Sequence, residues 1–263
     1  MTKCDKCPSC AIIYQRYSGM HLCREHFEED VHRKIREALR KTGLFGRDAR
    51  IAVGLDGSGK SATLAFVLKN LFIRRKDIDL LAVIIDEGKK TSPTADQARH
   101  VAEQLSLPYI VKGLPLLPDH EPPRIIHSTR KRELLFCTAE ENGAGILATG
   151  ETLDDEALEI FIGYLQGNAD AVARESSDQE EQRAAWIKPL RRIPEKEVRL
   201  YAIRRDLGFE NAAKLCNTDT LRGVAKGLLG GFDRRHPGTN YSLLRGLEKG
   251  PAQEGAGKGK AFK

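Results

Sequence analysis

The sequence predicts a doubly wound α/β fold, in which a parallel β-sheet carries helices on both faces, with an N-terminal zinc ribbon and a small helical C-terminal region. Three observations indicate this class. Short apolar runs alternate with helical patterns through the middle of the chain. Four of the six cysteines lie within the first 27 residues. Residues 188–247 show mainly helical patterns.

The strands are predicted where apolar residues form short buried runs, and a helical pattern follows each of them. The predicted strands are Ile51–Leu55, Leu80–Ile85, Tyr109–Val111 and Gly145–Ala148. The predicted helices cover residues 61–71, 95–105, 129–142 and 154–166. Strands that alternate with helices in this way favour a parallel sheet covered on both faces.

Composition divides the chain into five parts. These are a zinc ribbon at 1–27, a linker helix at 28–48, a nucleotide-binding domain at 49–186, a helical region at 187–249 and a Gly/Lys-rich tail at 250–263. The tail has no periodicity, so we expect it to be disordered.

The overall composition excludes two classes of protein. With 40% hydrophobic and 30% charged residues the chain has enough apolar side chains for a core, which excludes wholesale disorder. No apolar stretch approaches the roughly 20 residues that cross a bilayer, and Met1 leads into Cys4 without an apolar signal segment. We therefore expect a cytoplasmic protein without a membrane partner. The net charge of +6 is compatible with a polyanionic partner such as RNA but does not require one.

The N-terminal cysteines have the spacing of a structural zinc site. Cys4-x-x-Cys7 is followed, after 15 residues, by Cys23-x-x-His26. Two such knuckles supply the four soft ligands that tetrahedral Zn²⁺ prefers, and a segment this short has too little core to fold without metal. Cys7-Pro-Ser-Cys10 is a second CxxC pair, so the register is open, although the set with Cys4 is preferred. The alternative is a group of unligated thiols.

A glycine-rich loop follows the first predicted strand. Gly54-Leu55-Asp56-Gly57-Ser58-Gly59-Lys60-Ser61 has the letters GxxxxGKS and opens a helix. Glycines and helix N–H groups suit a phosphate cradle. Since Asp86-Glu87 ends the next strand, a Walker-type NTPase is one interpretation. A glycine turn without ligand is another.

Several further motifs carry a resemblance to a known family. They are the zinc knuckle with residues 14–27, Ile85-Asp-Glu-Gly88, Leu147-Ala-Thr-Gly-Glu-Thr-Leu-Asp-Asp-Glu-Ala157, Ile187-Lys-Pro-Leu-Arg191, Pro194-Glu-Lys-Glu-Val198 and His236-Pro-Gly-Thr239. With these motifs the chain resembles the tRNA 2-thiouridine synthetase group of the PP-loop ATPases, from about Cys4 to Lys249. A Walker NTPase would explain neither the zinc knuckle nor the helical C-terminal part.

The resemblance implies a fold, a reaction and partners. The fold is that of the PP-loop, adenine nucleotide alpha hydrolase-like domains. In the reaction ATP, with Mg²⁺, adenylates the uracil 2-oxygen of a tRNA, and sulfur then replaces that oxygen. The sulfur comes from a small, ubiquitin-like thiocarboxylated carrier protein. Dimers are common in the resembled family, which leaves a homodimer open.

The resemblance also implies roles for residues of this chain. Residues 54–61 would cradle the pyrophosphate part of ATP, Ile85 would sit near the adenine, and Gly150 would allow close approach of the nucleotide. Lys131 falls on an ATP-contacting lysine. Asp155, beside Asp154, falls on the acidic position implicated in activating the target.

Three departures from the family's pattern stand out. The family's loop reads Ser-Gly-Gly-Lys-Asp-Ser, and here Asp56 replaces its first Ser and Lys60 its Asp. Arg124 and His127 occupy the CxxC positions that bind a [4Fe–4S] cluster in many members, and Cys216 is offset from the third position. We therefore expect no such cluster. The second zinc ribbon of many members is also absent.

Each remaining candidate has a structural alternative. Lys131 also fits a solvated helix face, and Asp154 and Asp155 also fit the N-cap and first turn of a helix. The basic residues between Lys188 and Arg205 fit either tRNA phosphates or solvated helix charges. Loss of the loop Asp and the cluster cysteines also fits a divergent paralogue that binds tRNA or nucleotide without thiolating. Cys137 is expected to pack into a helix, and Cys216 is most simply a buried thiol.

Overall fold

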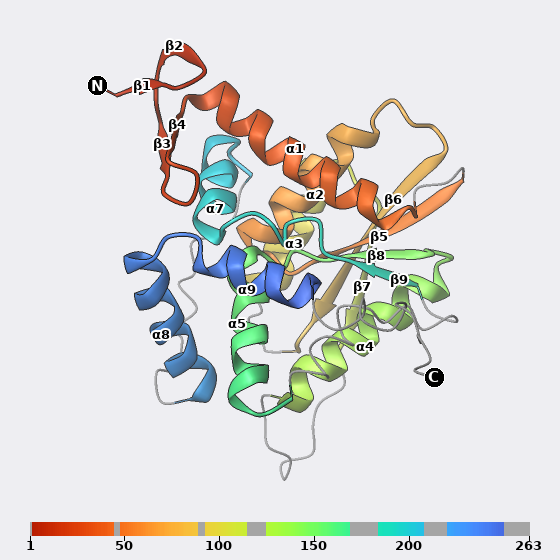
Figure 1. Ribbon diagram of the computed structural model, residues 1–263. Helices are drawn as coiled ribbons and strands as arrows, with labels where there is room; N and C mark the ends of the chain where they lie inside the picture. The colour runs from red at the N-terminus through yellow and green to blue at the C-terminus, as the bar shows by residue number, and fades with distance from the viewer. Residues whose placement is uncertain are drawn as a thin grey trace, which may run out of the picture.

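The computed structural model describes residues 2–44, 48–88, 93–114, 125–168, 184–207 and 220–249. Its centre is a five-stranded sheet made of β5 (Ala49–Leu55), β6 (Ile78–Asp86), β7 (Tyr109–Gly113), β8 (Ile146–Ala148) and β9 (Ala185–Ile187) (Figure 1). The strand order is β7-β6-β5-β8-β9 and every pair is parallel. The predicted doubly wound parallel fold is thus confirmed.

Helices cover both faces of this sheet, because the central strand β5 is buried on both sides. Ile51, Val53 and Leu55 share one core cluster with the helices α1 (Arg24–Thr42), α2 (Gly59–Phe72), α3 (Pro93–Gln104) and α7 (Glu195–Arg204). Ala52 points the other way, into a cluster with Phe136 of α4 (Ile125–Glu141). Successive side chains of a strand point to opposite faces, so a continuous apolar run is what such a strand requires.

The strand order reverses between β5 and β8. From β5 the chain moves outward through β6 to β7, and then returns to β8 on the other side of β5. The switch point of the sheet therefore lies between the carboxyl ends of β5 and β8. In open parallel sheets this switch point is where ligands bind.

The C-terminal helices divide between two cores. Tyr201 of α7 is buried in the main core. By contrast α8 (Leu221–Arg235) and α9 (Thr239–Glu248) pack against α5 (Leu153–Leu165), through small clusters around Ala225 and Leu244.

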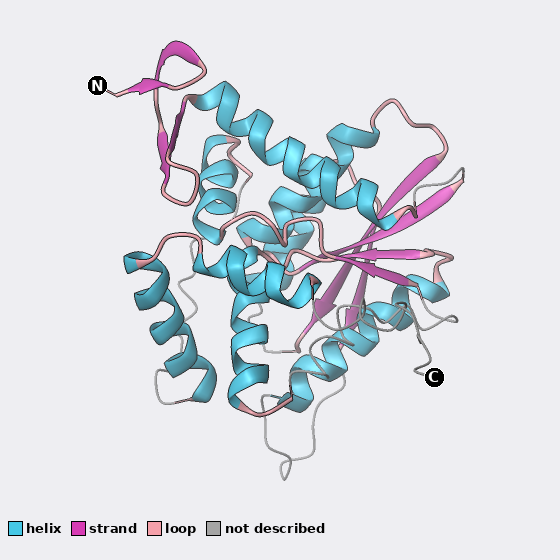
Figure 2. Cartoon of the chain, viewed as in Figure 1, coloured by secondary structure: helices cyan, strands magenta, loops and turns pink. Residues whose placement is uncertain are grey.

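The N-terminal ribbon consists of two short antiparallel pairs, β1 (Lys3–Cys4) with β2 (Cys7–Cys10) and β3 (Ile13–Gln15) with β4 (Met20–Leu22). These strands lie apart from the main sheet (Figure 2). Two of the expected boundaries between parts of the chain fall inside elements. Helix α1 begins at Arg24, ahead of the expected boundary at 28, and β9 runs across the expected boundary between 186 and 187.

Some sequence-based expectations cannot be compared with the fold. The tail at 250–263, Arg124 and Cys216 lie outside the described residues, as does the side chain of His127. Among the helices that the structure describes, none is long and apolar enough to span a membrane.

Candidate functional site

The glycine-rich loop makes a tight turn at the carboxyl end of β5. Gly57 has φ +74°, and a Cβ on it would lie 2.3 Å from the carbonyl oxygen of Thr94, so only glycine fits. Ser58 then caps α2 by accepting a hydrogen bond from the Ser61 N–H at 3.3 Å. The first N–H groups of a helix have no partner within it and carry partial positive charge, which favours an anion at this end of α2.

Asp56 fills part of this loop with its own negative charge. Its Oδ1 accepts hydrogen bonds from the Ser58 N–H (3.0 Å), the Ser58 hydroxyl (2.6 Å) and the Ser61 hydroxyl (2.6 Å). Burial alone would raise the pKa of Asp56, but these hydrogen bonds and the charge of Lys131 lower it to about 2. Asp56 is therefore ionised at neutral pH and occupies donors that a phosphate could otherwise use.

Lys60 reaches across the switch point to the other loop. Its Nζ lies 3.1 and 2.8 Å from the two carboxylate oxygens of Asp155, at the start of α5. Burial would lower the pKa of Lys60, but the charge of Asp155 and its hydrogen bonds raise it. Asp155 Oδ2 also accepts from the N–H and the hydroxyl of Thr152, at 2.9 and 2.8 Å. Lys60 thus pairs with Asp155 and not with Asp56.

The pKa of Asp155 moves in the opposite direction from that of most buried carboxyls. Burial would raise the pKa of Asp155, but the charge of Lys60 and the hydrogen bonds from Lys60 and Thr152 lower it. Both residues are about three-quarters shielded, with 29% and 24% of their side chains exposed. A carboxylate this well satisfied is a poor proton acceptor.

Two glycines bring the loops after β5 and β8 into contact. A Cβ on Gly150 would lie 3.2 Å from the backbone N of Ser61, and one on Gly54 would lie 3.4 Å from Cγ2 of Thr149. Leu55 and Ile85, at the ends of their strands, are buried in the core. The structure thus brings together residues 54–61, Gly150 and Asp155 from two separate motifs.

Lys131 and Asp154 have defined partners. Lys131 Nζ lies 3.1 Å from Glu87 Oε1, just beyond β6, so Lys131 is not simply a solvated helix charge. Asp154 accepts from the Glu195 N–H at 2.6 Å and from Asn240 Nδ2 at 3.3 Å. Asp154 therefore joins α5 to α7 and α9, which is a structural role.

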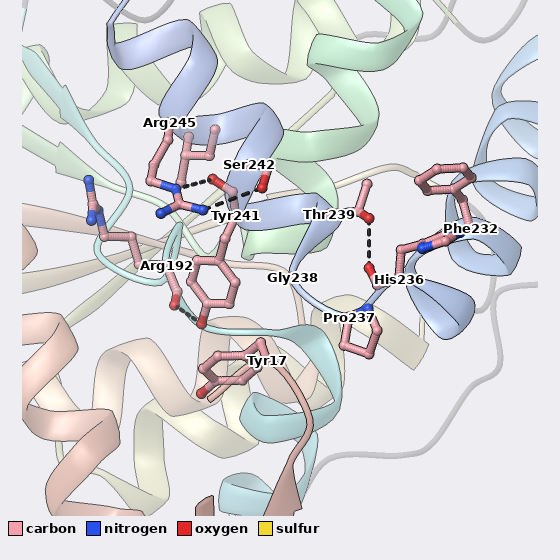
Figure 3. A pocket seen from close by; sticks show the side chains of 11 residues that line it. Tyr17, Arg192, Phe232, His236, Pro237, Gly238, Thr239, Tyr241, Ser242 and Arg245 are labelled. Carbon is pink, nitrogen blue, oxygen red and sulfur yellow. Dashed lines mark hydrogen bonds between the residues drawn. The ribbon is translucent and has the colours of Figure 1, made fainter. Parts of the chain in front are cut away.

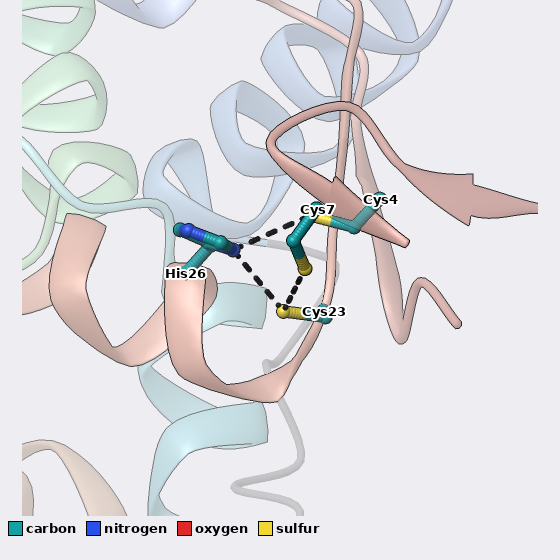
Figure 4. A group of neighbouring side chains, drawn as sticks. All are labelled: Cys4, Cys7, Cys23 and His26. Carbon is teal, nitrogen blue, oxygen red and sulfur yellow. Dashed lines mark hydrogen bonds between the residues drawn. The ribbon is translucent and has the colours of Figure 1, made fainter. Parts of the chain in front are cut away.

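The four predicted metal ligands converge at the ribbon (Figure 4). The ligand atoms of Cys4, Cys7, Cys23 and His26 all lie within 4.8 Å of one another. Cys7 Sγ is 3.6 Å from Cys23 Sγ, and His26 Nδ1 is 3.5 and 3.3 Å from the sulfurs of Cys4 and Cys23. A tetrahedron with zinc–ligand bonds of about 2.1–2.3 Å has edges of about 3.4–3.8 Å, so this donor set fits Zn²⁺.

The pKa values of two of these thiols move in opposite directions. Burial would raise the pKa of the Cys4 thiol, but backbone N–H groups of Cys23 and Lys6 lower it to about 6. The backbone N–H of His26 would lower the pKa of Cys23, but burial and the neighbouring sulfurs of Cys7 and Cys4 raise it. Thiolate is the form that binds metal. Cys10 is exposed and outside the group, which agrees with the preferred register. In the part of the chain that the structure describes, this is the only cluster of three or more side chains suited to a metal.

A separate hollow of about 680 Å³ lies between the ribbon and the turn from α8 to α9 (Figure 3). Its lining includes Tyr17, Arg192, Tyr241, Arg245 and the motif at 236–239. Arg192 is paired with Glu248 at 2.5 Å. Arg245 contacts only Tyr241 O (3.4 Å) and Ser242 Oγ (3.3 Å) and has no acidic partner among the described residues.

Several members of the basic stretch between Lys188 and Arg205 are also neutralised. Lys188 and Arg191 both pair with Glu156, at 2.7 and 3.0 Å, and Arg205 pairs with Glu28. These contacts favour the structural interpretation for those three residues.

Two residues near the switch point were not predicted from the sequence. Glu151, directly after Gly150, has a buried carboxylate oxygen without a hydrogen-bond partner in the described ranges. Trp186 of β9 donates from Nε1 to Thr149 Oγ1 at 2.6 Å, and Lys188 Nζ lies 4.2 Å from its ring. The only sequence signal for Glu151 was its place inside the Leu147–Ala157 motif.

The fold and site together define a class: an α/β protein of the PP-loop type, with a glycine-rich loop at the switch point and an N-terminal Cys/His metal ribbon. Comparison with known proteins supports this class. NH3-dependent NAD synthetase from Campylobacter jejuni shares the fold, with a TM-score of 0.50 and 13% identity over 84% of this chain and 92% of that one. Residues 3–28 match the family model described as "2-thiouridine synthetase TtuA, N-terminal LIM domain".

Closer relatives cover nearly the whole chain. The tRNA 2-thiolation protein NcsA of Haloferax volcanii is 31% identical, over 94% of this chain and 86% of its own length. The tRNA-5-methyluridine(54) 2-sulfurtransferase of Pyrococcus horikoshii is 29% identical, over 94% and 82%. The U34-tRNA thiolase NcsA from Methanococcus maripaludis, solved with its [4Fe-4S] cluster, gives a TM-score of 0.86 at 26% identity, over 94% and 86%.

This chain belongs to the family of the tRNA 2-thiolation proteins. The predicted resemblance is confirmed, and the Walker-type interpretation of the glycine-rich loop is not supported. The absence of a family-type cluster stays a prediction, because Arg124, the side chain of His127 and Cys216, which is offset from the third position, lie outside the described residues.

Proposed function

We propose that this protein uses ATP to activate a tRNA uridine at its 2-oxygen and then exchanges that oxygen for sulfur. The observation that carries the proposal is the contact between the two loops at the switch point. The glycine-rich loop and the motif at 147–157, which are far apart in the sequence, meet through Lys60 and Asp155 at 2.8 Å. Family membership over nearly the whole chain supports the same reaction.

The nucleotide would lie where α2 begins. Its phosphates would face the backbone at 54–61 and the N-terminal end of α2, where the helix dipole favours anions. The adenine would lie toward Ile85, and Gly150 would leave room for the nucleotide. Lys131, whose charge already stabilises the ionised Asp56, would add positive charge on the other side.

Asp56 sets a condition for this binding. Its carboxylate would repel phosphate at short range. We propose that Mg²⁺ enters with ATP and offsets that charge, since hard cations bridge phosphate and carboxylate oxygens. Because Asp155 is held by Lys60 and Thr152, we assign it to fixing the two loops against each other, which is a positioning role.

We propose zinc as the metal of the ribbon, held by Cys4, Cys7, Cys23 and His26. It would supply folding free energy to the ribbon and no step of the reaction. The tRNA partner follows from the proposed reaction. A ubiquitin-like sulfur carrier, a homodimer and a cytoplasmic location are expectations of the same proposal.

One observation favours a second candidate function. Because Asp56 accepts three hydrogen bonds from the loop, the wild-type loop is partly filled by its own side chain. A paralogue that binds tRNA or nucleotide without thiolating would tolerate this. Asp56→Ser frees those donors, so under this second function only the variant would bind ATP tightly.

The test is thiolation in vitro. Purified protein, ATP, Mg²⁺, sodium sulfide and unmodified tRNA are incubated, and digested nucleosides are analysed by mass spectrometry. We expect 2-thiouridine that depends on ATP. No 2-thiouridine, with tRNA binding intact, would support the second candidate instead.

A further inference from the structure

Glu151 is a partly buried acid, with its Oε2 shielded from solvent, that the proposed roles leave unused. It lies between Gly150 and the first turn of α5, at the switch point of the sheet. Its Oε2 is shielded from solvent and accepts no hydrogen bond from any residue that the structure describes. Leaving a buried acceptor unpaired destabilises the folded state, and more so when the group is charged, so an orphan of this kind calls for a functional reason.

The surrounding residues hold Glu151 in place and leave Oε2 unpaired. The Thr149 hydroxyl hydrogen-bonds to the Glu151 carboxyl. Trp186 Nε1 donates to the same hydroxyl at 2.6 Å, which leaves the hydroxyl proton for Glu151. Trp186 is in turn packed edge-on against Phe136, with ring centroids 6.0 Å apart. The carboxylate is thus oriented from β9 through Thr149.

The charged groups around Glu151 come from two elements and are already paired. Lys188, beyond β9, favours the ionised carboxyl but is bound to Glu156 at 2.7 Å. Asp155 of α5 disfavours the ionised form of Glu151, and Asp155 itself is paired with Lys60. Burial, the largest effect, raises the pKa of Glu151, against the opposing effects of Thr149 and Lys188.

Two neighbouring carboxyls therefore differ in their proton affinity. The pKa of Asp155 is lowered and that of Glu151 is raised. When the environments of two acids shift their pKa values in opposite directions, the acid with the raised pKa is the better proton acceptor, whereas the other stays ionised.

We propose that Glu151 is the general base that accepts the N3 proton of the target uracil while its 2-oxygen is adenylated. This inference rests on the proposed function. The uracil O2 attacks the α-phosphorus of ATP, an O2–P bond forms, and the bond to pyrophosphate breaks with its electron pair on the leaving group. The N3–H proton moves to Glu151 Oε2, and the N–H electron pair becomes part of the C2=N3 double bond. No oxidant or reductant is needed.

The test compares Glu151→Gln with wild type in tRNA-dependent pyrophosphate release across pH 5 to 9. Glutamine keeps the shape but does not accept a proton from N3. We expect the rate to fall about 10²- to 10⁴-fold, the range for loss of a general base. The acidic limb of the wild-type pH profile should disappear in the variant. Glu159→Gln, an exposed acid on the helix α5 that follows Glu151, is the matched control and should behave as wild type.

Stability separates a base from a structural residue. Since Glu151 is a partly buried orphan acid, Glu151→Gln should unfold at equal or higher urea concentration than wild type at pH 8. If Glu151→Gln stays active and the acidic limb of its pH profile is unchanged, Glu151 is not the base. That result would leave the proposed function standing. A joint loss of stability and activity would also overturn the base assignment, unless Glu151→Asp, which keeps a carboxylate, retains the acidic limb. A wild type that forms no 2-thiouridine would instead overturn the proposed function and this inference with it.

Discussion

Lys60 joins two loops through one ammonium group, and the rest of the site depends on that link. Its pairing with Asp155 removes one positive charge from the glycine-rich loop and one proton acceptor from the switch point. Under the proposed function, Asp56 and Glu151 are then the carboxylates left near the incoming phosphate and base.

Replacing Lys60 with Met should destabilise the protein by about 1–3 kcal/mol, because it leaves a shielded carboxylate without its cation. Asp155→Asn in the same chain should restore part of the loss. The measurement is urea unfolding, with Lys226→Met as control, since its contact with Glu195 is exposed and 3.9 Å long. That control should change stability by less than about 0.5 kcal/mol.

The effect of Lys60→Met should depend on pH. The lowered pKa of Asp155 contributes stability above its ordinary value of 3.8, and that stability is lost as pH falls through the folded-state pKa. The raised pKa of Lys60 contributes stability below its ordinary value of 10.5 that is lost as pH rises through the folded-state pKa. The difference between variant and wild type should therefore be largest between these limits and shrink below pH 3.8. An equal difference at pH 2 would contradict the ion pair.

Gly57→Ala should be more damaging than Gly143→Ala, although both glycines have positive φ, +74° and +68°. The second substitution meets open space and should cost only the left-handed backbone, about 1–2 kcal/mol. The first also drives a Cβ to 2.3 Å from Thr94 O, so its loss should be clearly larger. Chemical denaturation of both variants tests this. Equal losses of stability in the two variants would mean that the loop around Gly57 shifts to accommodate a Cβ at little cost.

At the scale of elements, the ribbon is the part whose sequence spacing predicted the structure best. Metal ligands must converge, so spacing alone identified the four residues. The spacing did not reveal that His26 lies on the first turn of α1, because a helix start without a clear capping residue is hard to place from sequence.

Other elements were harder to predict for physical reasons. β9 has three residues and gains its stability from pairing with β8, which no local pattern encodes. The contact between Lys60 and Asp155 joins residues that are 95 positions apart in the sequence. Pattern and spacing therefore predicted the sheet, the loop and the ribbon, whereas the pairing of charges required the fold.

Metal content should discriminate the two cysteine registers. Cys4→Ser should lose bound zinc, because it removes one of four ligands, whereas Cys10→Ser should retain about one zinc per chain. Elemental analysis after dialysis measures both, and iron with acid-labile sulfide reports any cluster in the same sample. Zinc lost from Cys10→Ser and kept in Cys4→Ser would overturn the assigned ligand set.

At the scale of the whole molecule, a buried polar network ties the ribbon to the body. Lys34 of α1 contacts Asp30 (2.9 Å), Glu197 of α7 (3.4 Å) and the hydroxyl of Tyr17 (2.6 Å). Tyr17 also packs against Tyr241 of α9 with the two rings tilted, at 4.7 Å between ring centroids. The ribbon, α8, α9 and the turn between these helices line the hollow of Figure 3.

If tRNA crosses this hollow, Arg245 is its most available cation. Arg245→Ala should weaken tRNA binding at every sequence and reduce the slope of log affinity against log salt by about 1. Arg222→Ala, whose side chain already pairs with Glu159, is the matched control. An unchanged slope for Arg245→Ala would place the RNA elsewhere.

The central claim, that the switch point presents the α-phosphate of ATP to a tRNA uridine, is tested most directly by identifying the cleaved phosphate bond. ATP labelled at the α-phosphate is incubated with protein, tRNA and sulfide, and the labelled product is compared with the 2-thiouridine formed. We predict AMP and 2-thiouridine in equal amounts. ADP as the labelled product, or 2-thiouridine without AMP, would contradict the account.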